Sequence, residues 1–251
     1  MNISKQSIKL PQEKKQNIKK QSLMFRNRAS CKIRDLAKFI GVLISSCPAV
    51  KYGWLYTKAL ERENYLALQR ANNFEANMDL PDYLKTDILW WEQNILGLYN
   101  DIIKNRFKVE IFTDSSLSGW GHAAEQRTYG FWSDQERACH INFLELQAVF
   151  YGLKCFASNE KNCCILVRSD NTTAISYVNK MGSIQYPKLN ILARQLWQWY
   201  ESRTIWLVAS YISSEDNFEA DHESRRVNED TERALSPDAL ETIRSTCDHW
   251  K

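Results

Sequence analysis

The chain has 251 residues, of which 44% are hydrophobic and 25% are charged, a balance typical of a folded protein that is soluble in water. No apolar stretch approaches the roughly 20 residues that are needed to cross a bilayer, so we expect no membrane partner. The seven cysteines form no CxxC pair and show no zinc-binding spacing. This pattern favours an intracellular protein over one held together by disulfides, without separating cytoplasm from nucleus.

Positive charge is concentrated at the start of the chain. Residues 1–38 hold eight Lys and three Arg against Glu13 and Asp35, a balance of +9, and the formal net charge of +3 therefore leaves −6 for the remainder. A basic front on an acidic body suggests a polyanionic partner, although a solvated basic tail is the plainer interpretation. We interpret residues 1–27 as a basic, poorly ordered lead-in, because they are polar and contain Pro11.

Residues 28–104 show the periodicity of helices. Apolar residues recur every three to four positions through residues 33–44, where Cys47-Pro48 then stops the helix. Two more helices are predicted, over residues 55–70 and from Pro81 to about residue 95. These segments predict a small helical subdomain that resembles the thumb or connection of a polymerase.

Residues 105–227 alternate between strand and helix patterns, and residues 228–251 form a C-terminal tail. Strands are predicted at 109–114, 119–124, 128–133, 164–169 and 204–210. Helices are predicted at 141–156, 172–180, 187–200 and 217–225. This order predicts the α/β class, with a mixed sheet flanked by helices and preceded by the helical subdomain.

Four acidic residues stand out in this second region. Asp114 and Asp170 each end a predicted strand, where the ligands of α/β sheets gather. Glu145 lies early in an apolar helix, where a carboxylate is costly to bury unless it is paired or binds a metal, and Asp221 lies early in the last helix. Any one of them has an ordinary explanation, as a turn residue or a first-turn helix acid. Together they suggest one acidic cluster.

Carboxylates without Cys or His partners are hard oxygen ligands, which suit Mg²⁺ or Mn²⁺ better than zinc. Two such ions about 3.5–4 Å apart can activate a water and stabilise the leaving oxygen of a phosphodiester. Crowded carboxylates also repel one another, so we expect some of their pKa values to rise when no metal is bound.

Four short motifs around these acids resemble the ribonuclease H domain of retroelement reverse transcriptases, and most of all that of the DIRS-type, tyrosine-recombinase retrotransposons. They are FTDSS at 112–116, HINFLEL at 140–146, SDN at 169–171 and NFEADHESR at 217–225. Upstream segments resemble the polymerase-to-ribonuclease-H connection of the same elements. These are IRDLAKFIG at 33–41, PAVKYG at 48–53, ALE at 59–61 and LWWEQNI at 89–95. The resemblance covers about residues 6–243.

The resemblance implies a ribonuclease-H-like fold in which Asp114, Glu145, Asp170 and Asp221 are catalytic and bind two Mg²⁺ or Mn²⁺ ions. The implied reaction is hydrolysis of the RNA strand of an RNA/DNA hybrid. It also implies that the chain is a fragment of a retrotransposon polyprotein, whose polymerase domain lies upstream, so we expect no DNA polymerisation from this chain alone. The residues expected to contact substrate are Ser115, Asn171, Lys180, Arg194, Asn217 and Arg225.

The sequence departs from the family pattern at Tyr211. Many ribonucleases H have a histidine ten residues before the last aspartate, and it is thought to move protons near the leaving group. A tyrosine, with an ordinary pKa near 10, cannot do this at neutral pH as an imidazole can. The alternative function is therefore a decayed or repurposed nucleic-acid-binding remnant with little or no catalysis.

Overall fold

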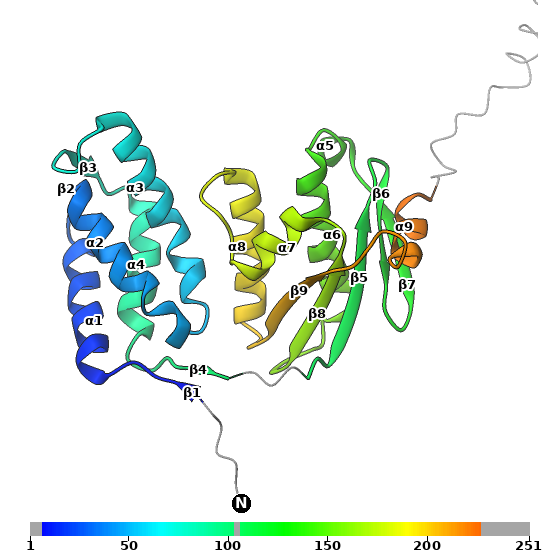
Figure 1. Ribbon diagram of the computed structural model, residues 1–251, viewed down its shortest axis with the longest axis horizontal. Coiled ribbons are helices and arrows are strands. Elements are labelled where there is room, and N and C mark those ends of the chain that lie inside the picture. The colour runs from blue at the N-terminus through cyan, green and yellow to red at the C-terminus, as the bar shows by residue number, and fades with distance from the viewer. Residues whose placement is uncertain (1–6, 103–105, 227–251) are drawn as a thin grey trace, which may run out of the picture.

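The computed structural model describes residues 7–102 and 106–226, so the predicted tail at 228–251 lies outside the described residues. Two parts lie side by side, a helical part and a part built on a sheet (Figure 1). The predicted fold class, a mixed α/β sheet flanked by helices after a helical region, is confirmed. Among the described residues, no helix combines the length and the apolar character required to span a bilayer.

The sheet has five strands in the order β7-β6-β5-β8-β9. Its strands are β5 (Val109–Ser115), β6 (Gly119–Ala123), β7 (Arg127–Phe131), β8 (Cys164–Ser169) and β9 (Trp206–Tyr211). β5, β6 and β7 form an antiparallel meander, whereas β8 runs parallel to both β5 and β9. The carboxyl ends of β5 and β8 therefore lie next to each other at one edge of the sheet.

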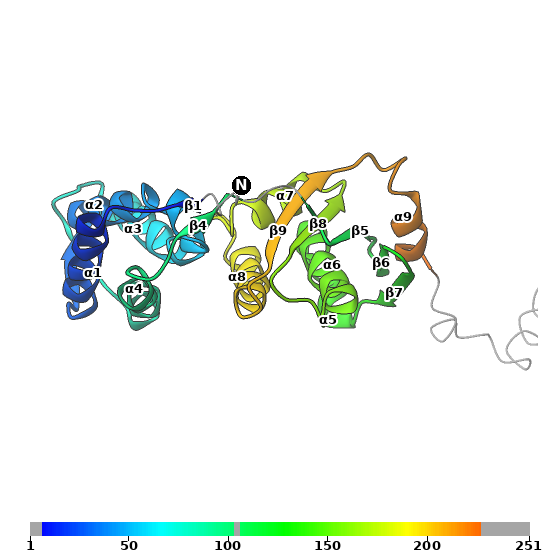
Figure 2. The same ribbon diagram turned by 90° about the horizontal axis from the view of Figure 1, so that it is seen from below.

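Helices cover both faces of this sheet (Figure 2). They are α5 (Asp134–Arg137), α6 (Ile141–Phe156), α7 (Thr172–Asn179), α8 (Pro187–Glu201) and α9 (Phe218–Ser224). On β6, a Cβ at Gly121 would lie 2.2 Å from the Ala220 carbonyl oxygen of α9, so only glycine permits this approach. The next residue, His122, contacts α6, where its Nε2 donates a hydrogen bond to the Ala148 carbonyl oxygen at 2.7 Å. Consecutive strand residues point to opposite faces, so α9 and α6 cover opposite faces of β6.

The helical part contains four helices, two 3-10 turns and two small strand pairs. The helices are α1 (Gln12–Arg26), α2 (Ile33–Ile44), α3 (Lys58–Ala71) and α4 (Asp82–Asn94). The turns are η1 (Cys47–Ala49) and η2 (Gly53–Tyr56). The strand pairs are β1 (Ser7–Ile8) with β4 (Asn100–Asp101), and β2 (Ser30–Lys32) with β3 (Asn77–Asp79). The predicted helix over residues 55–70 is in fact a 3-10 turn followed by α3.

The prediction that residues 1–27 are poorly ordered is wrong for residues 12–26, which form α1. Pro11 precedes this helix instead of interrupting it, as a residue with fixed φ at a helix start can. Ile18 and Phe25 are buried against the rest of the helical part. Lys15 donates through Nζ to the carbonyl oxygens of Leu96 and Leu98, at 2.9 and 2.7 Å. The many lysines of this helix concealed its apolar stripe.

The two parts share one hydrophobic core. The Tyr52 hydroxyl of the helical part donates to the Ile205 carbonyl oxygen at 2.8 Å, beside β9. Arg194 on α8 forms an ion pair with the buried Asp87 on α4. The division of the chain into separate domains therefore stays a prediction, since packing is continuous across it.

Candidate metal and nuclease site

Three acidic side chains from three separate elements converge at the edge where β5 and β8 end. Asp114 comes from β5, Glu145 from the second turn of α6, and Asp170 directly follows β8. One carboxylate oxygen of each lies within 4.8 Å of the others. The parallel pairing of β5 with β8 brings Asp114 and Asp170 together, because both strands end at the same edge of the sheet.

Glu145 is the most unusual of these carboxylates. Its side chain is buried, and its Oε2 has no hydrogen-bond partner among the described residues. Burial, followed by the negative charges of Asp114 and Asp170, raises the pKa of Glu145 to about 9. An unpartnered buried carboxyl of this kind costs free energy in the metal-free protein, which is the signature of a group that serves a ligand.

Asp114 and Asp170 are each oriented by a serine. The Ser224 hydroxyl donates to Asp114 Oδ2 at 2.6 Å, and the Ser214 hydroxyl donates to Asp170 Oδ2 at 2.6 Å. Burial raises the pKa of Asp114, and the hydrogen bond from Ser224 opposes this shift. Neither serine stood out in the sequence, because a hydroxyl that orients a carboxylate has no spacing signature of its own.

Asp221, the fourth predicted ligand, is not part of the three-residue group. Its Oδ1 accepts a hydrogen bond from Nε of Arg225 at 2.7 Å, one turn further along at the end of α9. Its negative charge nevertheless contributes to the raised pKa of Asp114, so it lies within electrostatic reach of the cluster. A ligand role for Asp221 stays a prediction.

Two residues predicted to contact substrate have structural roles. The Asn217 amide is buried and donates to the Thr113 carbonyl oxygen at 3.0 Å, which fixes the start of α9 against β5. Arg194 faces the helical part, where its guanidinium donates to Asp87 Oδ2 at 3.0 Å. Both polar groups are thus used inside the protein, and a substrate contact by either residue stays a prediction.

The other predicted substrate residues lie near the acidic cluster. Ser115 is the buried last residue of β5 and directly follows Asp114. Asn171 caps α7, where its Oδ1 accepts from the Ala174 amide at 2.9 Å, and its Nδ2 donates to Asn142 Oδ1 on α6 at 3.1 Å. Their contact with substrate stays a prediction, as does that of Arg225.

Lys180 lines a polar groove of about 580 Å³ that runs between α7 and the helical part. Lys58 of α3 lines the same groove, as do Asn142 of α6 and Tyr186 at the start of α8. Sequence reasoning missed the contribution of Lys58, because nothing in the helical part marks which of its lysines faces the sheet part.

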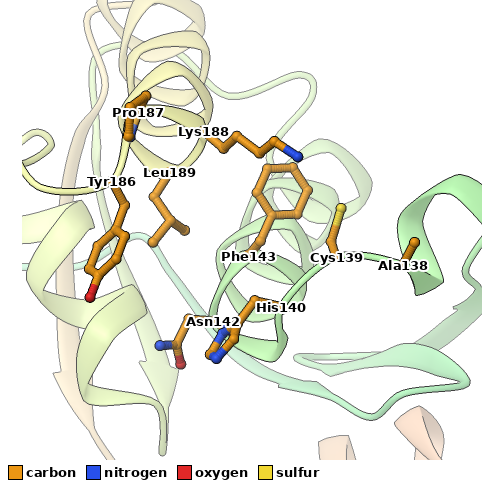
Figure 3. A pocket seen from close by; sticks show the side chains of 9 residues that line it. All are labelled: Ala138, Cys139, His140, Asn142, Phe143, Tyr186, Pro187, Lys188 and Leu189. Atoms are coloured by element: carbon orange, nitrogen blue, oxygen red, sulfur yellow. The ribbon is translucent and has the colours of Figure 1, made fainter.

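A second, more apolar groove of about 480 Å³ adjoins the first and shares Asn142 and Tyr186 with it. Figure 3 shows Phe143 and Leu189 facing this opening from α6 and α8, with Lys188 along its rim. Tyr186 is 60% exposed at the boundary of the two grooves. The two grooves thus meet at Asn142, one turn of α6 before Glu145.

Tyr211 is the last residue of β9 and is exposed. It lies in register with Ser169 on the neighbouring strand, the residue just before Asp170. His140 caps α6, with Nδ1 accepting from the Asn142 amide at 3.1 Å.

No protein-family model and no curated protein matches the sequence. Among solved structures, the chain is similar to RNase H1 from the halophilic archaeon Halobacterium salinarum NRC-1 (14% identity, TM-score 0.38), a match that covers 46% of this chain and 92% of that one. It is similar to LC11-RNase H1, solved in complex with an RNA/DNA hybrid (17% identity, TM-score 0.39), over 46% of this chain and 93% of that one. It also resembles a foamy viral protease-reverse transcriptase in complex with dsDNA (12% identity, TM-score 0.31), covering 82% of this chain and 42% of that one.

Proposed function

We propose that this protein is a divalent-metal-dependent endonuclease of the ribonuclease H type, which hydrolyses the RNA strand of RNA/DNA hybrids. The observation that carries the proposal is the buried, unpartnered Oε2 of Glu145 beside Asp114 and Asp170. The finer assignment, to the reverse transcriptase of a DIRS-type retrotransposon that works with an upstream polymerase domain, rests on the sequence motifs. The free cysteines in the described part of the chain support an intracellular site of action.

The residues present fit two Mg²⁺ or Mn²⁺ ions. The donor set is carboxylate oxygen only, which hard divalent ions prefer, and Glu145 Oε2 is available because nothing else binds it. Asp114, Glu145 and Asp170 would hold one ion, and Asp221 would join Asp114 at a second. When bound, such ions supply Lewis acidity to the attacking water and to the leaving oxygen. Glu145 would bind an ion as its carboxylate, with its proton released to solvent, and Ser224 and Ser214 hold the carboxylates of Asp114 and Asp170 in place.

The polar groove is the proposed path of one strand of the hybrid. Lys180 lines it with a positive charge, which suits the phosphates of a nucleic acid backbone, and Lys58 lines it in an ion pair with Glu61 at 3.2 Å. The amides of Asn142 and Asn171, which hydrogen-bond each other, lie where this groove approaches the acidic cluster. Polar side chains at this position can donate to sugar hydroxyls or base edges of an RNA/DNA duplex.

A cleavage assay on a labelled RNA/DNA hybrid with Mg²⁺ tests the proposal. We expect Asp114→Asn and Glu145→Gln each to reduce the rate by about 10²–10³-fold, since each weakens the binding of ions that would stabilise the transition state. Asp134→Asn is the matched control, because the side chain of Asp134 is fully exposed on α5. Asn and Gln variants that cleave as fast as the wild type would contradict the proposal.

A second candidate is a nucleic-acid-binding remnant with little or no catalysis. Two features favour it: Tyr211 stands at the position of the family histidine, and the Asp221 carboxylate is already paired with Arg225. In the same assay it predicts hybrid binding without cleavage in the wild type. Neither candidate includes DNA polymerisation by this chain.

A further inference from the structure

The Asp221 carboxylate is paired with a cation from its own chain. Arg225 holds Asp221 Oδ1 through Nε, and Asp221 is the main cause of the raised pKa of Arg225. Asp114 and Asp170 add smaller contributions in the same direction, so the guanidinium is within electrostatic reach of both. One positive charge therefore lies beside the carboxylates that are proposed to bind divalent ions.

The backbone that bears this ion pair is fixed to the sheet. The Ser224 hydroxyl donates to Asp114 Oδ2 at 2.6 Å and also contacts the Asp221 carbonyl oxygen at 2.9 Å. The Ser116 hydroxyl donates to the Ser224 carbonyl oxygen at 2.6 Å. Because α9 is locked to β5 in this way, Asp221 can exchange partners only by rotating its side chain.

The Arg225 side chain is free to leave. It is 68% exposed, against 35% for that of Asp221, so its departure into solvent removes little packing. An exposed ion pair at i and i+4 changes an equilibrium constant by only about twofold. A divalent ion held by several carboxylates can displace so weak a partner, but it must also overcome the repulsion of the guanidinium.

We propose that Arg225 is a built-in competitor for the second divalent ion: it occupies Asp221 in the metal-free protein and must release it before Asp221 joins Asp114 as a ligand. This inference rests on the proposed metal-dependent function. It gives Arg225 a role different from the substrate contact that the sequence suggested. Its consequence is a gap in affinity between the two ion sites, so that a one-ion form dominates at low metal concentration.

Mn²⁺ binding, followed by electron paramagnetic resonance and calorimetry at constant ionic strength, tests this without an activity measurement. We expect Arg225→Gln to tighten the second Mn²⁺ site about three- to tenfold, because it removes one positive charge close to a divalent ion. The first site should change by less. Arg226→Gln is the matched control: the adjacent Arg226 pairs with Glu223 and lies over the Tyr129 ring, and its loss should leave both sites unchanged.

A double-mutant cycle shows whether Arg225 competes with the ion for Asp221 or holds the Asp221 carboxylate in position. Asp221→Asn should remove the second site, and in that background Arg225→Gln should have an effect of about twofold or less on the remaining site. A second site that is unchanged or weaker in Arg225→Gln overturns the inference, because Arg225 would then be irrelevant or would hold Asp221 ready for the ion.

The same titration distinguishes this inference from the proposed function. If Asp114→Asn leaves both Mn²⁺ sites intact, the proposed function itself fails. If Asp114→Asn abolishes binding while Arg225→Gln changes nothing, only the role of Arg225 is lost.

Discussion

The interface between the two parts and the acidic cluster treat their carboxylates in opposite ways. Between the helical part and the sheet part, Glu201 accepts from the Tyr56 hydroxyl at 2.5 Å and from Trp90 Nε1 at 3.0 Å, and Asp87 is paired with Arg194. In the acidic cluster, Glu145 Oε2 has no partner among the described residues. The interface supplies partners to Glu201 and Asp87, whereas the cluster leaves Glu145 without one.

The difference shows where the fold gives up stability for function. Burial raises the pKa of Glu201, and the hydrogen bonds from Tyr56 and Trp90 oppose the shift. At Glu145 every contribution acts in one direction, because burial and two like charges all disfavour the ionised form. Protonation relieves this arrangement in the metal-free protein, and a bound cation can take the place of the proton, so the lack of any opposing protein group separates this carboxyl from those of the structural pairs.

The largest effect is expected at the interface, from Asp87→Asn. Burial raises the pKa of Asp87 even beside Arg194, so the pair gives little net stability, but breaking it leaves the guanidinium without its partner. We expect a loss of about 3 kcal/mol in the free energy of unfolding, measured by urea denaturation. Asp82→Asn on the same helix is the control, since the side chain of Asp82 is 93% exposed. A loss no greater than that of the control would show that the interface does not depend on this ion pair.

Glu145→Gln should have the opposite sign, and an effect that depends on pH. The folded-state pKa, about 9, lies above the ordinary 4.5, so folding favours the protonated carboxyl. The metal-free wild type therefore loses stability as pH rises from about 4.5 towards 9, and the neutral Gln variant does not. We expect the variant to be more stable by about 2–3 kcal/mol at pH 6.5 and equal to the wild type near pH 4.5.

Thermal unfolding across this pH range, in the presence of a chelator, measures the difference. Glu125→Gln, in the exposed turn between β6 and β7, supplies the control. Parallel stability curves for wild type and Glu145→Gln would mean that Glu145 is solvated or paired in solution, and the contrast between the two regions would disappear.

The sequence predicted the elements of the sheet part well, because each has a strong local signal. Residues 109–114 alternate as a half-buried strand should, and the apolar helix over 141–156 was predicted with the bounds that the structure has. The closeness of Asp114 and Asp170 was expected because strand ends in α/β sheets gather ligands, and Glu145 stood out as a carboxylate in an apolar helix. Local pattern and topology together were sufficient for these three residues.

Long-range pairing is what the sequence could not reveal. In the sequence, Arg194 resembles a phosphate-binding residue, because nothing near it shows that it pairs with Asp87, 107 positions earlier. In the sequence, Asn217 resembles a substrate-binding residue, whereas in the structure its amide donates to the Thr113 carbonyl oxygen. The helix α1 was missed because its lysines dominate its composition, although Ile18 and Phe25 are buried. In each case the decisive partner lies far away in the chain.

The smallest effect is expected at Tyr211, next to the acidic cluster. This exposed side chain lies on β9, in register with the residue that precedes Asp170, so it can approach a leaving group there. We expect Tyr211→His to accelerate hybrid cleavage by about tenfold, at the low end of general acid–base assistance, with a new dependence on pH near 6.5. Tyr211→Phe is the control, because it keeps the ring but supplies no titrating group in this range. Equal rates for the His and Phe variants would exclude proton transfer at this position, and cleavage would then depend on the carboxylates and their metal ions alone.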